Sequence, residues 1–182
     1  MGKYMREFTE ELITFIGEQK IFFVATAPSD EGRINLSPKG YESLALMNTH
    51  QLVYLDYAGS GNETANHVQE NGKITIMWNS FNSTPLILRA YGKGKVVAKN
   101  SEQYLSWMQQ FFPEVDPTTA RQLIAIDVES IQTSCGYGVP IMEFASERST
   151  LSRWAEKKAV EGTLDQYIEQ NASRSETKFP LI

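Results

Sequence analysis

The chain has 182 residues, of which 41% are hydrophobic and 21% are charged, as is typical of one globular domain. Its net charge of −5 and the lack of a basic run disfavour nucleic acid or an anionic membrane as the main partner. Cys135 is the sole cysteine, which excludes an internal disulfide and favours a reducing compartment. No apolar stretch reaches the roughly 20 residues that a membrane-spanning helix needs. We therefore expect one soluble, cytoplasmic domain over residues 1–182.

The first half of the chain alternates short strands with two helical segments. Residues 8–19 carry apolar side chains at helical spacing after a threonine that can cap the helix, and they predict an amphipathic helix. A second helix is predicted over residues 63–70. Pro38 cannot continue a central ladder, so we expect a strand to stop there and Lys39 to project from the rim. The predicted strands of this half are residues 20–27, 33–37, 44–48, 51–56 and 73–79.

The second half begins with a long strand over residues 86–99, in which Gly92 and Gly94 predict a bend or bulge. The remaining predicted elements are a helix at 101–112, a strand at 123–133, helices at 149–158 and 164–171, and an extended tail to Ile182. This pattern indicates a mainly β protein. We expect a barrel of six to seven antiparallel strands with peripheral helices and a C-terminal helical extension from about residue 149.

A glycine-rich turn, GSGNET at residues 59–64, joins a predicted strand to a predicted helix. A helix start presents unpaired backbone N–H groups and the positive end of the helix dipole, which favour a phosphate. The small residues let an anion approach the backbone, and Asn62 and Thr64 can add side-chain donors. The turn is thus a candidate phosphate site of a flavin or nucleotide. The alternative is an ordinary turn in which Asn62 caps the helix.

Two cations are further candidates for binding a ligand. Lys39 could face a phosphate or the edge of a flavin that becomes negative on reduction, or it could be an ordinary surface lysine. Arg89 lies in an apolar strand segment, where a buried charge requires a partner. That partner could be a bound phosphate or the carboxylate of Asp56 or Glu63.

The loop QTSCGY at residues 132–137 is the last candidate. It could donate hydrogen bonds to a planar ring, with Tyr137 closing the pocket, or form a structural turn around a buried, inert thiol. His50 and His67 are not at metal-ligand spacing from each other or from Cys135, so no metal site is expected. No Gly-x-Ser-x-Gly turn indicates a hydrolase, and we assign no side chain a catalytic role.

Taken in order, these motifs resemble the flavoproteins related to pyridoxamine 5′-phosphate oxidase. The resemblance covers roughly residues 10–160 and rests on FFVATA, GRINLSPKG, LVYLDYAGSGNETANHVQENGKITIMW, ILRAYGKGKVV and SIQTSCGYGVP. The chain looks most like an uncharacterised subgroup with the motifs NLSPKG, GSGNET and QTSCGYGVP. The resemblance implies an FMN-binding split barrel that forms a homodimer, with the cofactor at the interface.

The resemblance also implies which segments bind FMN. Residues 34–39 would run along the flavin, residues 59–64 would hold the phosphate, and the strand containing Arg89 would also face the cofactor. The loop at 132–137 would come from the second subunit. The implied cofactor-binding residues are Asn35, Ser37, Lys39, Ser60, Asn62, Thr64, Arg89, Gln132, Ser134 and Tyr137.

Two departures from that family bear on function. The oxidases carry an Arg-Lys pair near the phosphate where this chain has Glu63-Thr64, and their basic and aromatic C-terminal substrate motif is missing here. We therefore expect weaker FMN binding and a substrate other than pyridoxamine phosphate. The expected function is an FMN-dependent oxidoreductase acting on a small organic substrate, with NAD(P)H as reductant. The alternatives are a non-catalytic flavin- or haem-type-binding protein, and a split barrel that has lost its cofactor and serves as an interaction module.

Overall fold

The computed structural model describes residues 2–172 and contains eight strands and five α-helices in that part of the chain. The predicted extended tail to Ile182 lies outside the described residues. The elements are β1 Tyr4–Met5, α1 Glu10–Glu18, β2 Phe22–Thr26, β3 Asn35–Lys39, β4 Leu44–Asn48, β5 Gln51–Tyr57, α2 Glu63–Asn71, β6 Lys73–Asn79, β7 Ile87–Ala98, α3 Glu102–Phe111, a 3-10 turn at Pro117–Thr119, β8 Ala120–Ser134, α4 Thr150–Val160 and α5 Leu164–Asn171.

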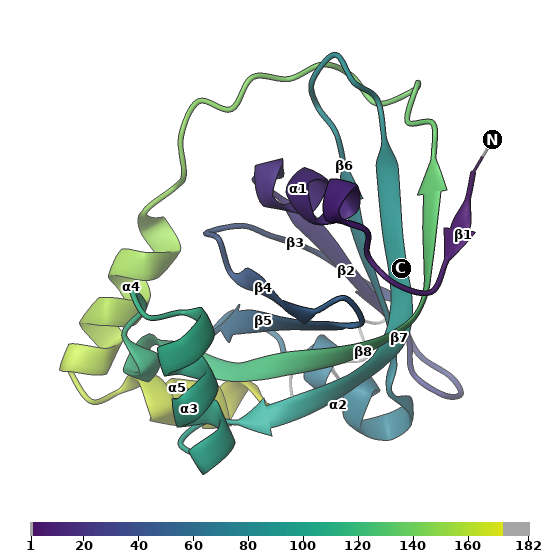
Figure 1. The fold of residues 1–182 in the computed structure, drawn as a ribbon. Coiled ribbons are helices and arrows are strands. Elements are labelled where there is room, and N and C mark those ends of the chain that lie inside the picture. The colour runs from purple at the N-terminus through teal and green to yellow at the C-terminus, as the bar shows by residue number, and fades with distance from the viewer. Residues whose placement is uncertain (1, 173–182) are drawn as a thin grey trace, which may run out of the picture.

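All strands belong to one antiparallel sheet in the order β3-β2-β6-β7-β8-β5-β4. The long strands β7 and β8 curve and wrap the sheet around an interior (Figure 1). Strand β1 pairs with the last part of β8, beyond the stretch that pairs with β5. The mainly β prediction is confirmed, with one strand more than predicted. A two-residue strand such as β1 has no sequence period of its own and forms only because β8 offers a free edge there.

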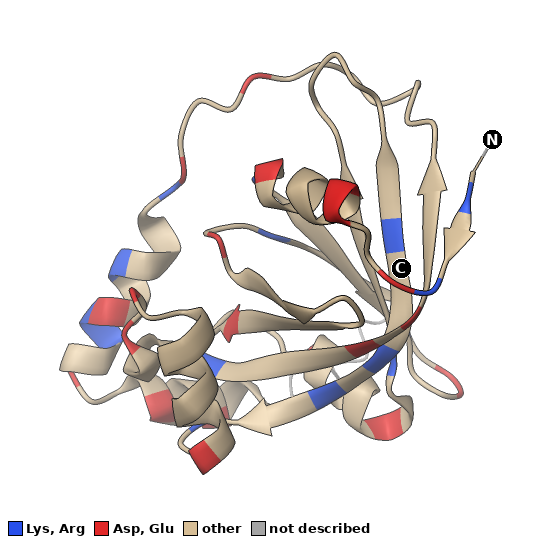
Figure 2. Ribbon diagram, viewed as in Figure 1, with Lys and Arg blue, Asp and Glu red and all other residues tan. Residues whose placement is uncertain are grey.

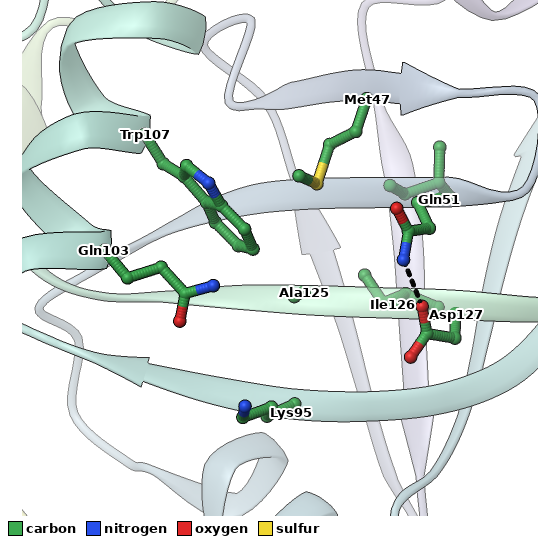
Figure 3. Close-up of a pocket in the computed structure, with 9 residues that line it drawn as sticks. Met47, Gln51, Lys95, Gln103, Trp107, Ala125, Ile126 and Asp127 are labelled. Carbon is green, nitrogen blue, oxygen red and sulfur yellow. Dashed lines mark hydrogen bonds between the residues drawn. The ribbon is translucent and has the colours of Figure 1, made fainter.

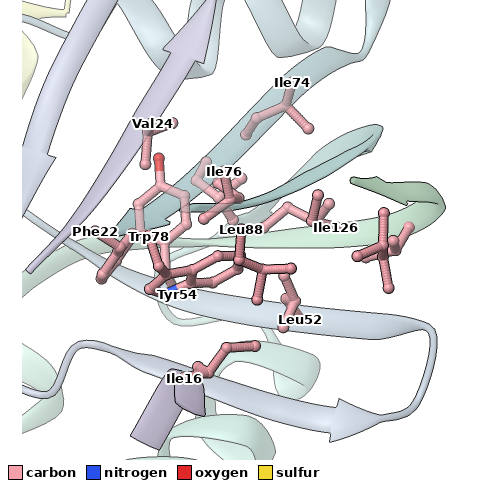
Figure 4. Close-up of a cluster of buried hydrophobic side chains, with 14 of the residues drawn as sticks. Ile16, Phe22, Val24, Leu52, Tyr54, Ile74, Ile76, Trp78, Leu88 and Ile126 are labelled. Carbon is pink, nitrogen blue, oxygen red and sulfur yellow. The ribbon is translucent and has the colours of Figure 1, made fainter. Parts of the chain in front are cut away.

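The interior of the barrel is apolar because alternate residues of each strand point inward. In β2 the inward positions Phe22 and Val24 are buried, and the same alternation continues into Ile76 of β6 and Leu88 of β7. Figure 4 shows these side chains packed together with Trp78 and Tyr54. Helix α1 closes this interior with Leu12 and Ile16, and Phe8, which precedes the helix, belongs to the same cluster.

A second apolar cluster lies between the sheet and α3. Tyr104 and Met108 of α3 pack against Val53, Leu55 and Leu123 on β5 and β8. Ser101 caps α3 by accepting a hydrogen bond from the Tyr104 N–H. Helix α4 packs on the turn Pro117–Thr119 and on α5, and an extended segment leads to it from the end of β8 (Figure 1). Among residues 2–172, no helix is long and apolar enough to cross a membrane.

Two bulges shape strand β8. The first lies opposite Tyr91 and Gly92, where the register shifts, and a Cβ at position 92 would collide with the carbonyl of Asp127. The predicted bend at Gly92 is thus confirmed. The second lies opposite Asp56 and Tyr57, which pair with Gln122 and Ala120, so that Arg121 is the extra residue. A bulge re-aims side chains, and this one directs Arg121 to the same side as Gln122.

Strand β3 differs from the prediction. It continues through Pro38 to Lys39, whereas Pro38 was expected to end it. β3 is an edge strand that pairs only with β2, so the N–H that proline lacks is not needed on the open side. Because the strand continues, Lys39 lies within the ladder opposite Phe22 and does not project from a rim.

Candidate functional site

The residues implied for cofactor binding fall into two groups on opposite faces of the sheet. Asn35, Ser37 and Lys39 pair with Thr26, Val24 and Phe22, the inward-facing residues of β2. Directly paired residues share a face, so this first group faces the interior. Arg89 alternates with the buried Leu88 and Ala90 and therefore points to the outer face. Within one chain the two groups do not form one pocket.

The inner group is centred on the buried carboxylate of Asp56, which is 2% exposed. Arg121 donates to Asp56 Oδ2 from Nε at 3.1 Å and from Nη2 at 2.9 Å. Gln122 Nε2 donates to the same oxygen at 2.8 Å, and Lys39 Nζ lies 3.3 Å from Oδ1. We call the set Asn35, Ser37, Lys39, Asp56, Asn62, Thr64, Arg121 and Gln122 the turn cluster.

The charges of the turn cluster do not cancel. One carboxylate, Asp56, serves two cations, Lys39 and Arg121, which leaves one excess positive charge at the site. Burial alone would raise the pKa of the Asp56 carboxyl. The charges of Lys39 and Arg121 and the hydrogen bonds from Gln122 and Arg121 outweigh that effect and hold its pKa below the ordinary value. Asp56 is therefore ionised at neutral pH.

The same side chains hold the glycine-rich turn. Arg121 Nη1 donates to the carbonyl of Gly61 at 2.7 Å, and Gln122 Nε2 donates to Asn62 Oδ1 at 2.9 Å. Asn62 is the N-cap residue of α2 by position, but its side chain makes no capping hydrogen bond. Asn62 is thus the N-cap residue, as the ordinary-turn alternative expects, but its side-chain oxygen accepts from Gln122 and not from the helix N–H groups. The first N–H groups of α2 remain without a side-chain acceptor from Asn62.

A chain of hydrogen bonds links α2 to β3 and β2. Asn35 Nδ2 donates to Thr64 Oγ1 at 2.9 Å and to Thr26 Oγ1 at 3.3 Å, and Ser37 Oγ donates to Asn35 Oδ1 at 2.9 Å. Thr26 Oγ1 also lies 3.0 Å from Nδ1 of the buried His67. Asn35, Ser37 and Thr64 are thus brought together as implied. Thr64 is buried and turned inward, so its hydroxyl is not directed at solvent.

A buried hydroxyl lies beside this chain. Tyr54 is fully buried, and its hydroxyl has no hydrogen-bond partner of good geometry among the described residues. Burial, together with the charge of Asp56, raises the pKa of Tyr54 well above its ordinary value, while the nearby Thr64 hydroxyl and Arg121 oppose the shift. The first turn of α2 therefore has an unused polar atom next to it, which is the kind of group that a bound ligand satisfies.

Glu63 covers one of the two glycines of the turn. A Cβ at position 61 would collide with both carboxylate oxygens of Glu63, so the Glu63 side chain folds back over Gly61. Beside Gly59, in contrast, a Cβ would meet nothing within 4 Å. Ser60 is exposed at the tip of the turn. The turn therefore has open space beside one glycine and a carboxylate over the other.

The outer-face cluster consists of Tyr4, Arg89, Tyr91, Gln132 and Ser134. Arg89 Nη1 donates to Ser134 Oγ at 3.1 Å, Tyr91 Oη to Gln132 Oε1 at 2.8 Å, and Gln132 Nε2 to Tyr4 Oη at 2.8 Å. Figure 2 shows further basic segments along β7, which carries Lys93 and Lys95 as well. This outer face is therefore rich in donors.

Two of the alternatives left open for this region by the sequence are wrong. Among the described residues, Arg89 has no carboxylate within ion-pair distance, so it pairs with neither Asp56 nor Glu63. Asp56 forms its ion pairs with Arg121 and Lys39. Cys135 is exposed and free, so the loop is not a turn around a buried thiol. Tyr137 is 81% exposed and closes no pocket within one chain. Within residues 2–172 no cluster of His, Cys, Asp and Glu side chains is placed to hold a metal ion.

A pocket of about 370 Å³ lies just beyond the strand ends that carry Lys39 and Asp56. Tyr41 and Tyr57, whose ring centroids are 5.8 Å apart, line it together with Phe144, and Lys20 Nζ lies 5.9 Å from the Phe144 ring. The backbone of Tyr41 and Glu42 has positive φ values of 64° and 51°, which turns both side chains out of the β3 ladder. The pocket thus has aromatic walls and includes residues that directly follow Lys39 and Asp56 in the chain.

A second pocket, of about 210 Å³, lies between α3 and the sheet. Figure 3 shows Met47 and Trp107 at its apolar side and the hydrogen bond from Gln51 to Asp127, whose atoms are 2.6 Å apart. None of the residues implied for cofactor binding lines this pocket. It is therefore separate from both clusters.

Arg121 and Gln122 are the central side chains that sequence reasoning missed. They precede the apolar run LIAI, and the strand was predicted to begin after them, at Leu123. The sequence did contain a signal for Arg121, namely an arginine beside an apolar run, which is the pattern that identified Arg89 as a candidate. Their shared contact with Asp56 depends on the register between β5 and β8, which no local pattern reveals.

Comparisons with known proteins agree with this fold. The sequence profile of the family described as pyridoxamine 5′-phosphate oxidase matches residues 8–135. The pyridoxamine 5′-phosphate oxidase family protein ustO of Aspergillus flavus is 32% identical over 194 residues, which cover 99% of this chain and 78% of that protein.

Solved structures share the architecture at lower identity. HupZ from Group A Streptococcus superposes with a TM-score of 0.55 at 22% identity, over 68% of this chain and 91% of the HupZ chain. A candidate pyridoxamine 5′-phosphate oxidase from Lactobacillus delbrueckii gives a TM-score of 0.53 at 16% identity, over 70% and 98% of the two chains. These matches confirm the split-barrel prediction. By its sequence and its fold, the chain is a member of the pyridoxamine 5′-phosphate oxidase family.

Proposed function

We propose that this protein binds FMN without a covalent link, as a cytoplasmic homodimer with single-domain subunits, and acts as an oxidoreductase on a small organic substrate with NAD(P)H as reductant. The observation that carries the proposal is the turn cluster in a chain of this family. It joins a glycine-rich turn, an uncapped helix start and an excess positive charge. These features suit a phosphate.

The donor set of the turn cluster fits the two ends of FMN. The N–H groups at the start of α2 and the positive charge shared by Lys39 and Arg121 would hold the phosphate, with Ser60 at the tip of the turn. Asn35 and Ser37, on the inward face of β3, would lie along the ring. When bound, the flavin supplies the hydride chemistry. The side chains of this chain would orient it, and none of them needs to act as acid or base.

The second subunit completes the pocket in this proposal. Arg89, Gln132 and Ser134 face away from the turn cluster of their own chain, because they lie on the outer face of the sheet. In a homodimer the outer-face cluster of one subunit would meet the turn cluster of the other, with the exposed Tyr137 beside the ring. The aromatic pocket of Tyr41, Tyr57 and Phe144 would then take a planar organic substrate next to the flavin.

An absorption spectrum of the purified protein tests the proposal, followed by mass spectrometry of whatever acid releases. We expect flavin absorption, either as purified or after addition of FMN, and release of intact FMN. Sedimentation should give a mass near twice the 20.6 kDa of one chain. Bleaching of the flavin by NADH or NADPH then tests the reductase step. A protein that takes up no flavin under any of these conditions would overturn the proposal.

The position of Glu63 favours a second candidate, a split barrel without a flavin that serves as an interaction module. A carboxylate over Gly61 repels a phosphate unless it moves. A colourless protein that stays colourless in excess FMN, while still sedimenting as a dimer, would favour this candidate. A stable flavin complex that no nicotinamide reduces would instead favour a non-catalytic flavin-binding protein.

A further inference from the structure

We propose that Glu63 determines how strongly this protein distinguishes a phosphorylated flavin from riboflavin, because its carboxylate competes with the phosphate for the turn. The inference rests on the proposed function, in that it assumes a flavin bound at the turn cluster. It adds a residue that opposes binding and sets the selectivity of the site.

The geometry places Glu63 where an anion would lie. Its carboxylate folds back over Gly61, on the side of the turn that a Cβ would fill. Among the described residues this carboxylate makes no hydrogen bond or ion pair, so no partner holds it there. It lies at the start of α2, where Asn62 leaves the helix N–H groups without a side-chain acceptor and where an anion is favoured. Glu63 is thus a resident anion with no bond that an incoming phosphate would have to break.

Two features independent of the helix start lie beside this turn and suit a polar, anionic ligand there. The buried Tyr54 hydroxyl has no partner of good geometry among the described residues and lies beside Thr64 in the first turn of α2. The excess positive charge of Lys39 and Arg121 is held by contacts between 2.7 and 3.3 Å to Asp56 and Gly61, so it is fixed next to the turn.

The competition acts on the phosphate alone. A flavin phosphate carries nearly two negative charges at neutral pH, and a carboxylate within a few ångströms repels it. Riboflavin has the same ring and ribityl chain but no phosphate, so the Glu63 charge should hardly change its binding free energy. The ratio of the FMN and riboflavin dissociation constants therefore reports on Glu63 specifically.

The test compares Glu63→Gln with wild type by titrating each with FMN and with riboflavin and following the quenching of flavin fluorescence. Glutamine keeps the size of the side chain and removes its charge. We expect FMN to bind about tenfold more tightly to the variant, which corresponds to about 1.4 kcal/mol, with riboflavin affinity unchanged. Glu63→Lys, which reverses the charge, should increase the FMN affinity further.

Glu102→Gln is the control, because Glu102 is likewise a glutamate in the first turn of a helix, α3, although it is exposed whereas Glu63 is half-buried. It should leave both affinities as in wild type. FMN binding by Glu63→Gln alone, with none by wild type, would also support the inference. Equal FMN affinity in wild type and both Glu63 variants would overturn the inference and leave the proposed function standing. Failure of every form to bind either flavin would overturn the proposed function and the inference with it.

Discussion

The turn cluster and the outer-face cluster contain similar side chains, but these side chains are hydrogen-bonded to different extents. Each contains an arginine, a glutamine and hydroxyl or amide groups. Arg121 is 7% exposed and directs three hydrogen bonds at Asp56 and Gly61, whereas Arg89 is half-buried and makes one, to Ser134. A guanidinium has five N–H donors, so Arg89 keeps most of its donors for a ligand. Arg121 therefore shapes the site and contributes its charge to it, whereas Arg89 has free N–H donors with which to contact a ligand.

The largest expected effect is on stability, and it separates the two arginines. Arg121→Met removes the main partner of a buried carboxylate, and we expect it to lower the free energy of unfolding by about 3–5 kcal/mol. Arg89→Met removes one contact of a half-exposed side chain and should cost less than about 1 kcal/mol. Urea denaturation of both variants measures the difference. An equal loss of unfolding free energy in both variants would contradict the view that Arg121 is structural and Arg89 is not.

The next effect is on FMN binding at the turn. The double substitution Asn62→Ala with Thr64→Ala removes two side chains that shape the start of α2, and it should weaken FMN binding by about 1–3 kcal/mol. Asn82→Ala with Thr84→Ala is the matched control, because this exposed Asn-x-Thr sequence lies in the turn between β6 and β7. Titration with FMN compares the two. An affinity unchanged by the first pair would remove the turn from the flavin site.

A smaller effect follows from the pKa of Asp56, which is lowered in the folded protein. A carboxyl with a lowered pKa stabilises the fold at pH values above its unfolded pKa of about 3.9 and loses that contribution as the pH falls through the folded pKa. Stability should therefore decline below about pH 4. Asp56→Asn should show a shallower decline over the same range, because the asparagine does not titrate. Thermal unfolding from pH 7 to pH 3 measures both, and parallel curves would contradict the assignment.

The smallest expected effect is a partial recovery of FMN binding when two variants are mixed. It tests whether the turn cluster of one subunit meets the outer-face cluster of the other. Arg89→Ala and the Asn62/Thr64 double variant should each bind FMN weakly alone. In an equal mixture that exchanges subunits at random, about one quarter of the sites would combine two intact clusters, since half of the dimers are mixed and each has one such site. FMN titration of the mixture should show that fraction of tight sites. No recovery after verified exchange would contradict the shared pocket.

Local patterns in the sequence predicted most of the fold. Strand alternation and helical spacing placed β4, β6 and α5 at the residues that the structure shows, and Gly92 marked the place in β7 that lies opposite a bulge in β8. These features depend on side chains a few residues apart, which is why they can be recognised without the fold. The glycine-rich turn at residues 59–64 was recognisable for the same reason.

The tertiary structure alone decided the chemistry of the site. Asp56 meets Arg121 and Gln122 because β5 pairs with β8 in one register, and a bulge turns two neighbouring side chains to one side. Lys39 lies within the ladder because β3 is an edge strand that tolerates Pro38. Long-range pairing depends on how the whole sheet closes, so the sequence determined which residues could bind a ligand, and the fold determined which of them face the same space.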